Sequence, residues 1–273
     1  MKTYRSDTVQ VNGIDIHYYR STPPGGAPTL LLLHGLTDNG MCWVRVADAL
    51  CESYDVVMPD TRGHGLSEKP AAGYSLEGRA ADVAGLIDAL SLDHPILFGH
   101  SLGGQAAMAI AALYPQKVGG VVLEDPAWFD APGDEEAGEE NAKRWLSDLL
   151  AQQSLDRAAL IAECSQKNPA WHADEVSTWA ESKYQMDGEA LVQILTSMSG
   201  GWQQYVNKAS CPILLVTAEP ELGAIITPEM VEEASALWKQ GQEAHIPGAG
   251  HCIHRDQFDL YMKEVKAFLS GLG

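Results

Sequence analysis

A serine between small residues is the part of this chain whose spacing points most directly to chemistry. Residues 98–104 place Ser101 between Gly99 and Gly103. A short apolar run ends just before this serine, and a stretch rich in helix-forming residues begins just after it. A turn from strand to helix within one or two residues needs neighbours without bulky side chains, and it leaves the hydroxyl exposed. Ser101 is therefore a candidate nucleophile.

The base that such a nucleophile needs is also present. A serine hydroxyl is unreactive at neutral pH until a neighbouring group accepts its proton. The best candidate is His251, which follows a strand-like segment and a turn at residues 247–250. His254 is interpreted as a surface histidine or one that supports the site indirectly. His34 and His100 adjoin the turns next to the nucleophile and are expected to fix loop structure by hydrogen bonds.

Two backbone N–H groups are candidates for stabilising a negatively charged oxygen. The N–H of Leu102 lies at a predicted helix N-terminus, where unpaired donors and the helix dipole favour an anion. The N–H of Leu36 directly follows His34 and Gly35, at the end of another apolar run. Leu36 and Leu102 are therefore predicted to form an oxyanion hole.

Four motifs occur in an order that resembles a known enzyme family. They are a strand followed by His-Gly (29–35), Asp-x-Arg-Gly-His-Gly (60–65), Gly-His-Ser-Leu-Gly-Gly (99–104) and a late Gly-Ala-Gly-His (248–251). In composition and order they resemble the α/β-hydrolase family over nearly the whole chain, apart from its middle. The resemblance implies a triad of serine, histidine and an acid, with acyl transfer through a covalent ester on Ser101. This chemistry needs no metal and no organic cofactor.

The acid of the triad is where the chain departs from the family pattern. The resemblance places an aspartate shortly after the strand that ends near Thr217, but the chain there carries Glu219 and Glu221. The other position that the family uses is the end of the preceding strand, where Asp125 lies. Both strand ends can reach the same imidazole. Asp125 is the preferred candidate, and Glu221 and Glu219 remain alternatives.

The segments around these residues predict an α/β fold with a mostly parallel, doubly wound sheet. Asn12 and Gly13 lie between alternating apolar residues and predict an antiparallel hairpin that opens the sheet. Apolar runs then alternate with helical patterns; the runs are 29–33, 55–59, 95–98 and 119–124, and the helical patterns lie near 42–52, 76–91 and 102–115. Because ligands bind at the carboxyl ends of the strands in such sheets, we expect the motif residues at that edge.

Between residues 126 and 209 the alternation of strands and helices stops, and the chain shows helical patterns only. This segment resembles the helical cap of many α/β hydrolases. The predicted helices of this segment are 141–153, 154–166, 171–185 and 188–199. The core domain would then comprise residues 1–125 and 210–273. Five of the seven tryptophans lie between Trp128 and Trp202. Most are expected to fill the cap's own core, and one or two to line the substrate pocket.

Composition and charge fit one soluble enzyme domain with an insertion. A formal net charge of −19 argues against nucleic acid or an anionic membrane as a partner. Much of the acid lies between Asp130 and Glu140, interpreted as a hydrated loop that begins the cap. No apolar run resembles a signal peptide or reaches the ~18 residues of a membrane span, so we expect a cytoplasmic protein. The five scattered cysteines indicate neither a disulfide framework nor a zinc site, and Cys252 is interpreted as a buried thiol.

The predicted function is hydrolysis of carboxylic esters or lactones of small, partly apolar substrates through an acyl-enzyme on Ser101. An acyl-homoserine lactone would suit such a pocket. Carbon–carbon bond hydrolysis and peracid formation are alternatives within the family. A ligand-binding receptor without catalytic activity is an alternative of another class. The residues do not indicate an oligomeric state.

Overall fold

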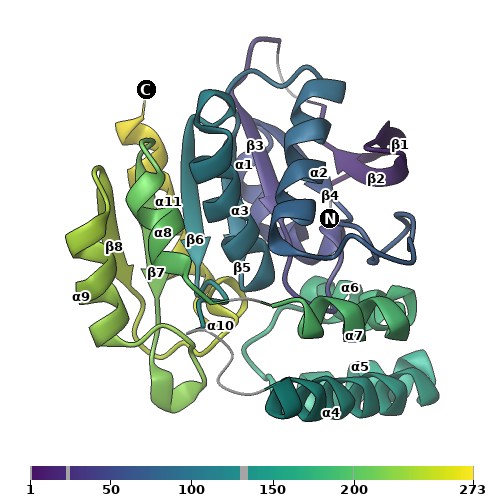
Figure 1. The fold of residues 1–273 in the computed structure, drawn as a ribbon. Helices are drawn as coiled ribbons and strands as arrows, with labels where there is room; N and C mark the ends of the chain where they lie inside the picture. The colour runs from purple at the N-terminus through teal and green to yellow at the C-terminus, as the bar shows by residue number, and fades with distance from the viewer. Residues whose placement is uncertain (1, 23–24, 130–134, 199, 273) are drawn as a thin grey trace.

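An eight-stranded sheet forms the centre of the computed structural model, which describes residues 2–22, 25–129, 135–198 and 200–272 (Figure 1). The order across the sheet is β1-β2-β4-β3-β5-β6-β7-β8. The pairs β1–β2 and β2–β4 are antiparallel, and all other pairs in this sheet are parallel. In chain order the strands are β1 (Arg5–Val11), β2 (Ile14–Arg20), β3 (Thr29–Leu33), β4 (Asp55–Pro59), β5 (Ile96–His100), β6 (Gly120–Glu124), β7 (Ile213–Thr217) and β8 (Gly241–His245).

The predicted strands form where their apolar runs lie. Asn12 and Gly13 have φ of 51° and 82°, and positive φ at both central residues is what a type I′ hairpin turn requires. Every residue of β3 to β7 is buried. Strands covered on both faces are largely apolar, which is why these strands stand out in the sequence as apolar runs with polar residues only at their ends. The hairpin and the doubly wound parallel sheet are both confirmed.

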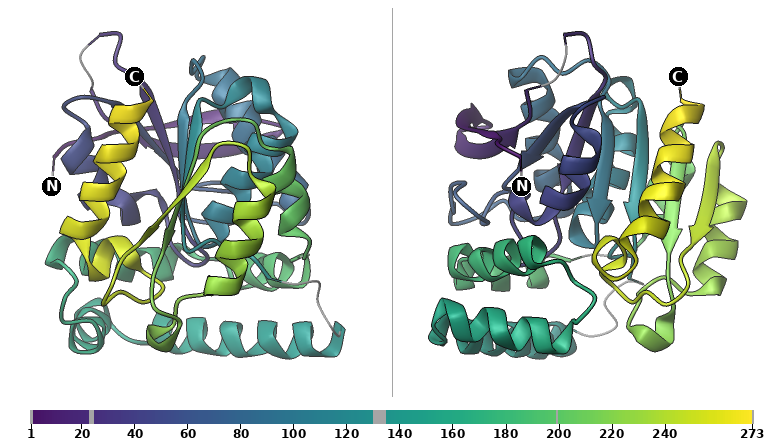
Figure 2. Two further views of the ribbon diagram at one scale, coloured as in Figure 1. Left: turned by 90° about the vertical axis from the view of Figure 1, so that its left-hand side faces the viewer. Right: turned by 180° about the vertical axis from the view of Figure 1, so that it is seen from behind.

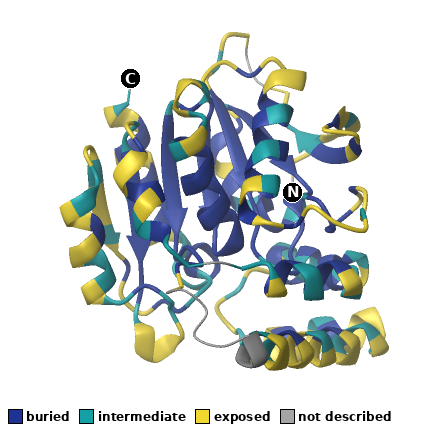
Figure 3. Cartoon of the chain, viewed as in Figure 1, coloured by how far each residue is buried: buried dark blue, intermediate teal, exposed yellow. Residues whose placement is uncertain are grey.

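Helices cover both faces of the sheet and enclose two apolar cores (Figure 2). Leu31 and Leu33 belong to one core and Leu30 and Leu32 to the other, as the alternation of side chains along a strand requires. The helices of the first core are α2 (Leu76–Ala89), α3 (Leu102–Leu113), α8 (Trp202–Lys208) and α9 (Pro228–Leu237). Those of the second core include α1 (Val44–Leu50) and α11 (Phe258–Gly271). Figure 3 shows the sheet buried between these layers. Within the described ranges, none of the helices is long and apolar enough to cross a membrane.

Four further helices, here called the cap helices, lie at the carboxyl ends of the parallel strands (Figure 1). They are α4 (Glu135–Ser154), α5 (Arg157–Lys167), α6 (Ala173–Gln185) and α7 (Gly188–Thr196). Buried residues of α4 and α7 join Tyr74 and Leu102 in a third apolar cluster. The helix that follows, α8, packs against α3 instead. The division into a core of 1–125 and 210–273 and a cap of 126–209 stays a prediction.

Two expectations about the middle of the chain are wrong, namely that most of its tryptophans fill a core of the cap and that its acidic segment is a loop, whereas Trp145 and Trp179 do line a cavity. The third apolar cluster contains no tryptophan among its described residues. Trp128 and Trp202 stack on each other in the first core, with ring centroids 4.5 Å apart, because α8 returns to the sheet and offers their large faces a buried surface there. Residues 135–140 of the acidic segment belong to α4 rather than to a loop, since glutamate is a good helix former and favours a first helical turn. Residues 130–134 of that segment lie outside the described residues.

The turn between β5 and α3 brings two stretches of backbone into close contact. A Cβ atom on Gly99 would lie 2.3 Å from the carbonyl oxygen of Gly103, and one on Gly103 would lie 2.1 Å from that of Leu33. Between them Ser101 adopts φ 52° and ψ −116°, a backbone conformation that is costly for a residue with a side chain. The small neighbours that the sequence places around Ser101 are therefore required by this packing.

We expect Gly99→Ala to lower the free energy of unfolding by about 1–3 kcal/mol, because the added methyl group meets backbone that cannot move aside. Gly138→Ala in α4 is the matched control, since a Cβ there meets nothing within 4 Å. That substitution is expected to be neutral or to stabilise by roughly 0.5–1 kcal/mol. Urea denaturation measures both variants, and equal stability of Gly99→Ala and wild type would contradict the close contact.

Candidate active site

Two cavities meet at Ser101, at the carboxyl edge of the sheet. The first has a volume of about 350 Å³ and the second of about 360 Å³. Both are lined by Ser101 and His251, together with Leu36, Arg144 and Trp145. The predicted nucleophile and the predicted base therefore face the same space, although 150 positions separate residue 101 from residue 251.

His251 is held by Asp125 at the end of β6. The Nδ1 atom of His251 lies 2.6 Å from the Oδ2 atom of Asp125, and because a carboxylate can only accept, Nδ1 donates. The buried carboxylate also accepts hydrogen bonds of 2.9–3.0 Å from the backbone N–H groups of Ile225 and Ile226. These donors hold the carboxylate in place beside the histidine. With Nδ1 engaged, Nε2 is the ring nitrogen of His251 that can accept a proton.

Neither glutamate alternative reaches His251 in the described structure. Glu221 is exposed in a short 3-10 helix, η3 (Pro220–Leu222). The Oε1 atom of Glu219 accepts a hydrogen bond of 3.2 Å from the backbone N–H of Gly248. Asp125 is thus the candidate acid that the fold brings to the histidine.

The two predicted oxyanion donors border the second cavity beside Ser101. Leu36 and Leu102 both line it. Neither backbone N–H has a hydrogen-bond partner within the part of the chain that the structure describes. For Leu102 the reason is its place as the first residue of α3, where a helix leaves N–H groups unpaired. Both donors remain available to an oxygen atom next to Ser101.

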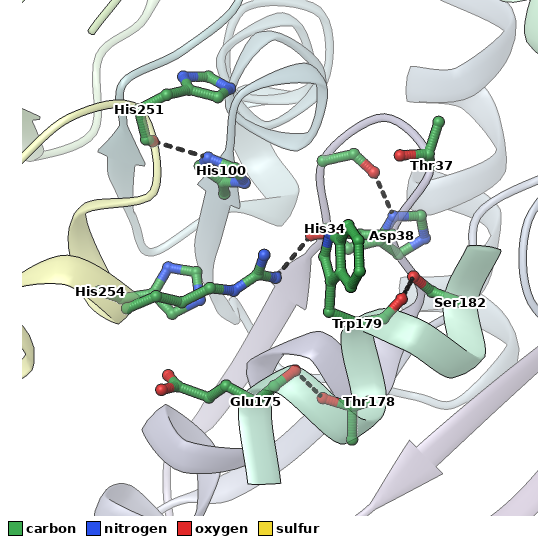
Figure 4. A network of polar contacts seen from close by, with 12 residues as sticks. His34, Thr37, Asp38, His100, Glu175, Thr178, Trp179, Ser182, His251 and His254 are labelled. Atoms are coloured by element: carbon green, nitrogen blue, oxygen red, sulfur yellow. Dashed lines mark hydrogen bonds and ion pairs between the residues drawn. The ribbon is translucent and has the colours of Figure 1, made fainter. Parts of the chain in front are cut away.

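His34 and His100 hold the loops around this site, as predicted. The Nε2 atom of His34 accepts a hydrogen bond of 3.0 Å from the backbone N–H of Thr61. The Nε2 atom of His100 donates to the carbonyl oxygen of His251 at 2.9 Å (Figure 4). Burial lowers the pKa of His100 to about 3, so this side chain is neutral at neutral pH. It positions the backbone of His251 without adding a charge.

A second pair of carboxylate and histidine lies behind the first, and the sequence analysis missed it. Both oxygens of the Glu124 carboxylate lie 2.8 Å from Nδ1 of His254, and the ring of His254 stacks on Trp43 at 4.5 Å. Burial would raise the pKa of Glu124, but His254 outweighs it and lowers the pKa to about 2. His254 itself is 1% exposed, so its interpretation as a surface histidine is wrong. The available signal was a glutamate ending an otherwise apolar buried strand, since an unpaired carboxylate there would be costly.

A cluster of three buried charges joins the loop after β3 to α6 and to α10 (Ile253–Asp256). We call Asp38, Lys183 and Arg255 the Asp38 cluster. The Nζ atom of Lys183 donates to Oδ1 of Asp38 at 3.0 Å and to the carbonyl oxygen of Thr37 at 3.0 Å. Nη2 of Arg255 donates to Oδ2 of Asp38 at 2.6 Å. Burial would raise the pKa of Asp38, but Arg255 and Lys183 outweigh it and hold that pKa well below its usual range.

Cys252, next to the candidate base, carries an unreactive thiol. Burial raises its pKa to about 12, so the thiol is protonated at neutral pH. All five cysteines are free. Within the described residues, no group of three or more His, Cys, Asp or Glu side chains is arranged to hold a metal ion.

Comparison with known proteins identifies the family. The sequence pattern of the alpha/beta hydrolase fold matches residues 28–257. The chain belongs to the alpha/beta hydrolase family. It is 29% identical over 254 residues to 2-(acetamidomethylene)succinate hydrolase of Mesorhizobium japonicum, covering 90% of this chain and 89% of the relative. It is 30% identical over 265 residues to N-formylmaleamate deformylase of Pseudomonas putida, covering 96% and 95%.

A solved structure of a relative has the same architecture. The crystal structure of E-2-(acetamidomethylene)succinate hydrolase superposes with a TM-score of 0.84 at 26% sequence identity, covering 98% of this chain and 100% of that one. The match extends along nearly the whole alpha/beta hydrolase chain, including the segment that holds the cap helices. The fold predicted from the motifs is therefore confirmed.

We expect Asp38→Asn to lower the free energy of unfolding at pH 7 by about 3–5 kcal/mol, because it leaves two buried cations without their anion. Asp93→Asn is the matched control: its side chain is 95% exposed, and a change within about 0.5 kcal/mol is expected. The stability that Asp38 contributes is present above its unfolded pKa of about 3.9 and is lost as the pH falls toward its lower folded pKa. Denaturation at pH 7 and at acid pH should show the difference from wild type shrinking only in acid.

Proposed function

We propose that this protein is a serine hydrolase of carboxylic esters or lactones, with Ser101 as nucleophile, His251 as general base and Asp125 as the acid that orients it. The observation that carries this proposal is the 2.6 Å contact between His251 and Asp125. The same histidine lines both cavities together with Ser101. The strained turn at Ser101 supports it, because such strain is retained where it serves to present a side chain. The cap helices, which cover these cavities, would form the substrate-binding lid.

The mechanism follows from these positions. Nε2 of His251 takes the proton of the Ser101 hydroxyl as its oxygen attacks the substrate carbonyl. The backbone N–H groups of Leu36 and Leu102 stabilise the negative oxygen of the tetrahedral intermediate. The imidazolium is stabilised by Asp125, and it then protonates the leaving group. Water repeats the same steps on the acyl-enzyme and releases the acid.

Hydrolysis of an amide is a second candidate, and the named relatives favour it. One of them is named a deformylase of N-formylmaleamate and the other a hydrolase of an acetamido compound. An amine leaves after protonation by the histidine, so the same residues would serve. Both names also denote carboxylate anions, which fits the charges found around the first cavity.

Wild-type protein is expected to hydrolyse members of a panel of short-chain acyl esters, lactones and N-formyl amides, as measured by proton release. The rate of Ser101→Ala is expected to be lower by about 10⁴-fold or more. Ser270→Ala, at an exposed serine of α11, is the matched control and should retain full activity. A serine-directed fluorophosphonate should label wild type but not Ser101→Ala. Absence of both turnover and labelling would favour the ligand-binding receptor.

Asp125→Asn is expected to lower kcat by up to about 10⁴-fold, because the amide cannot hold the histidine in the tautomer that accepts a proton. Glu221→Gln is the matched control and should leave kcat near the wild-type value, since Glu221 is exposed. Steady-state kinetics on the best substrate of the panel compares the two. A large loss with Glu221→Gln and full activity with Asp125→Asn would reassign the acid.

A further inference from the structure

We infer that the substrate carries a free carboxylate, which binds in the first cavity beside Arg144 and the Asp38 cluster. This inference rests on the proposed function, because it names the substrate class of the same site.

The two cavities that meet at Ser101 differ in their charge. The first is lined by three cations, Arg144, Lys183 and Arg255, and by two acids, Asp38 and Asp148. In the second, Arg144 is the one Lys, Arg, Asp or Glu side chain among the described lining residues, and the walls are largely apolar. One part of a substrate would therefore meet charge and the other an apolar surface.

The excess of cations in the first cavity runs against the composition of the chain, which has 37 acidic and 18 basic residues. The Asp38 cluster sets two positive charges against one negative charge, and Lys183 and Arg255 are each 2% exposed. His100, which also lines this cavity, is neutral because burial lowers its pKa to about 3. A buried positive charge without a counter-ion is costly, and an anion in the cavity reduces that cost.

Arg144 adds to these positive charges a guanidinium group that is available to a ligand. Its Nη2 atom donates a hydrogen bond of 2.7 Å to Oδ1 of Asn141. Between described residues Arg144 makes no ion pair, and neither does the exposed Asp148, one helical turn further along α4. A guanidinium has five N–H donors in a planar fork that matches the two oxygens of a carboxylate. Arg144 is therefore placed as the specificity-determining residue for an acidic substrate.

The size of the first cavity limits the acidic part of the substrate to a short chain. A volume of about 350 Å³ lies at the lower end of the range for small-molecule sites. Ser101, where the two cavities meet, would attack the carbonyl, and the free carboxylate would lie a few bonds away. The substrate class that fits is a monoester, lactone or monoamide of a short dicarboxylic acid.

A matched pair of substrates tests this inference. Monoethyl succinate carries the carboxylate, and ethyl levulinate replaces it with a neutral methyl ketone of nearly equal size. Wild type is expected to show a kcat/KM about 10- to 100-fold higher for monoethyl succinate, measured by ethanol release, because a hydrogen bond to a charged group has that effect. Arg144→Gln should reduce this preference by about 10-fold or more, mainly through KM. Lys143→Gln removes the same charge from an exposed position of α4 outside both cavities, and should change neither value.

The outcomes separate this inference from the proposed function. Equal or better hydrolysis of ethyl levulinate by wild type, or an equal loss on both esters in Arg144→Gln, would overturn the carboxylate site. If wild type hydrolyses neither ester and no fluorophosphonate labels Ser101, the proposed function fails. Calorimetric titration of succinate into the wild-type protein then decides the carboxylate site alone. Binding that weakens in Arg144→Gln but not in Lys143→Gln upholds it, and no binding at millimolar succinate overturns it.

Discussion

The close contact between β5 and α3 fixes the positions of the groups around Ser101. Gly99 and Gly103 leave no room for a side chain, so the strand and the helix cannot slide past each other without collision. Gly103 also lies against the carbonyl oxygen of Leu33, which ties the end of β3 to the first turn of the same helix. Two separate stretches of backbone, at Leu36 and at Leu102, therefore border one space. Their relative placement depends on backbone packing rather than on side-chain contacts, which relax more easily.

Local patterns in the sequence were sufficient to predict the sheet and the turns at its edge. The hairpin at Asn12 and Gly13 depends on backbone conformation, which residue type largely decides. The buried strands appear as apolar runs because both of their faces are covered. Ser101 and His251 stand in motifs whose glycines have a local steric role. Each of these features involves residues close together in the sequence, where pattern and structure correspond directly.

The features that sequence reasoning missed depend on contacts between distant segments. Lys183 and Arg255 reach Asp38 across 145 and 217 positions in the sequence. Helical periodicity can indicate whether the side chain of Lys183 faces the protein interior or the solvent. It cannot indicate which carboxylate that side chain contacts. The tryptophans show the same limitation. The sequence shows that residues 126–209 are rich in aromatic residues, but it does not show that α8 packs against α3. This packing is what places Trp128 and Trp202 in the first core. Charge pairing and the docking of an insertion are properties of the folded chain as a whole.

The bonds that Lys183 makes to the loop after β3 also limit how the site can open. Swinging α6 away from the sheet would remove the ammonium group from Asp38 and Thr37 and break three hydrogen bonds, while Asp38 would keep its contact with Arg255. Displacement of α6 is therefore disfavoured, and α4 is tied to the same segment, because Nε2 of Gln153 donates to the carbonyl oxygens of Lys183 and Met186.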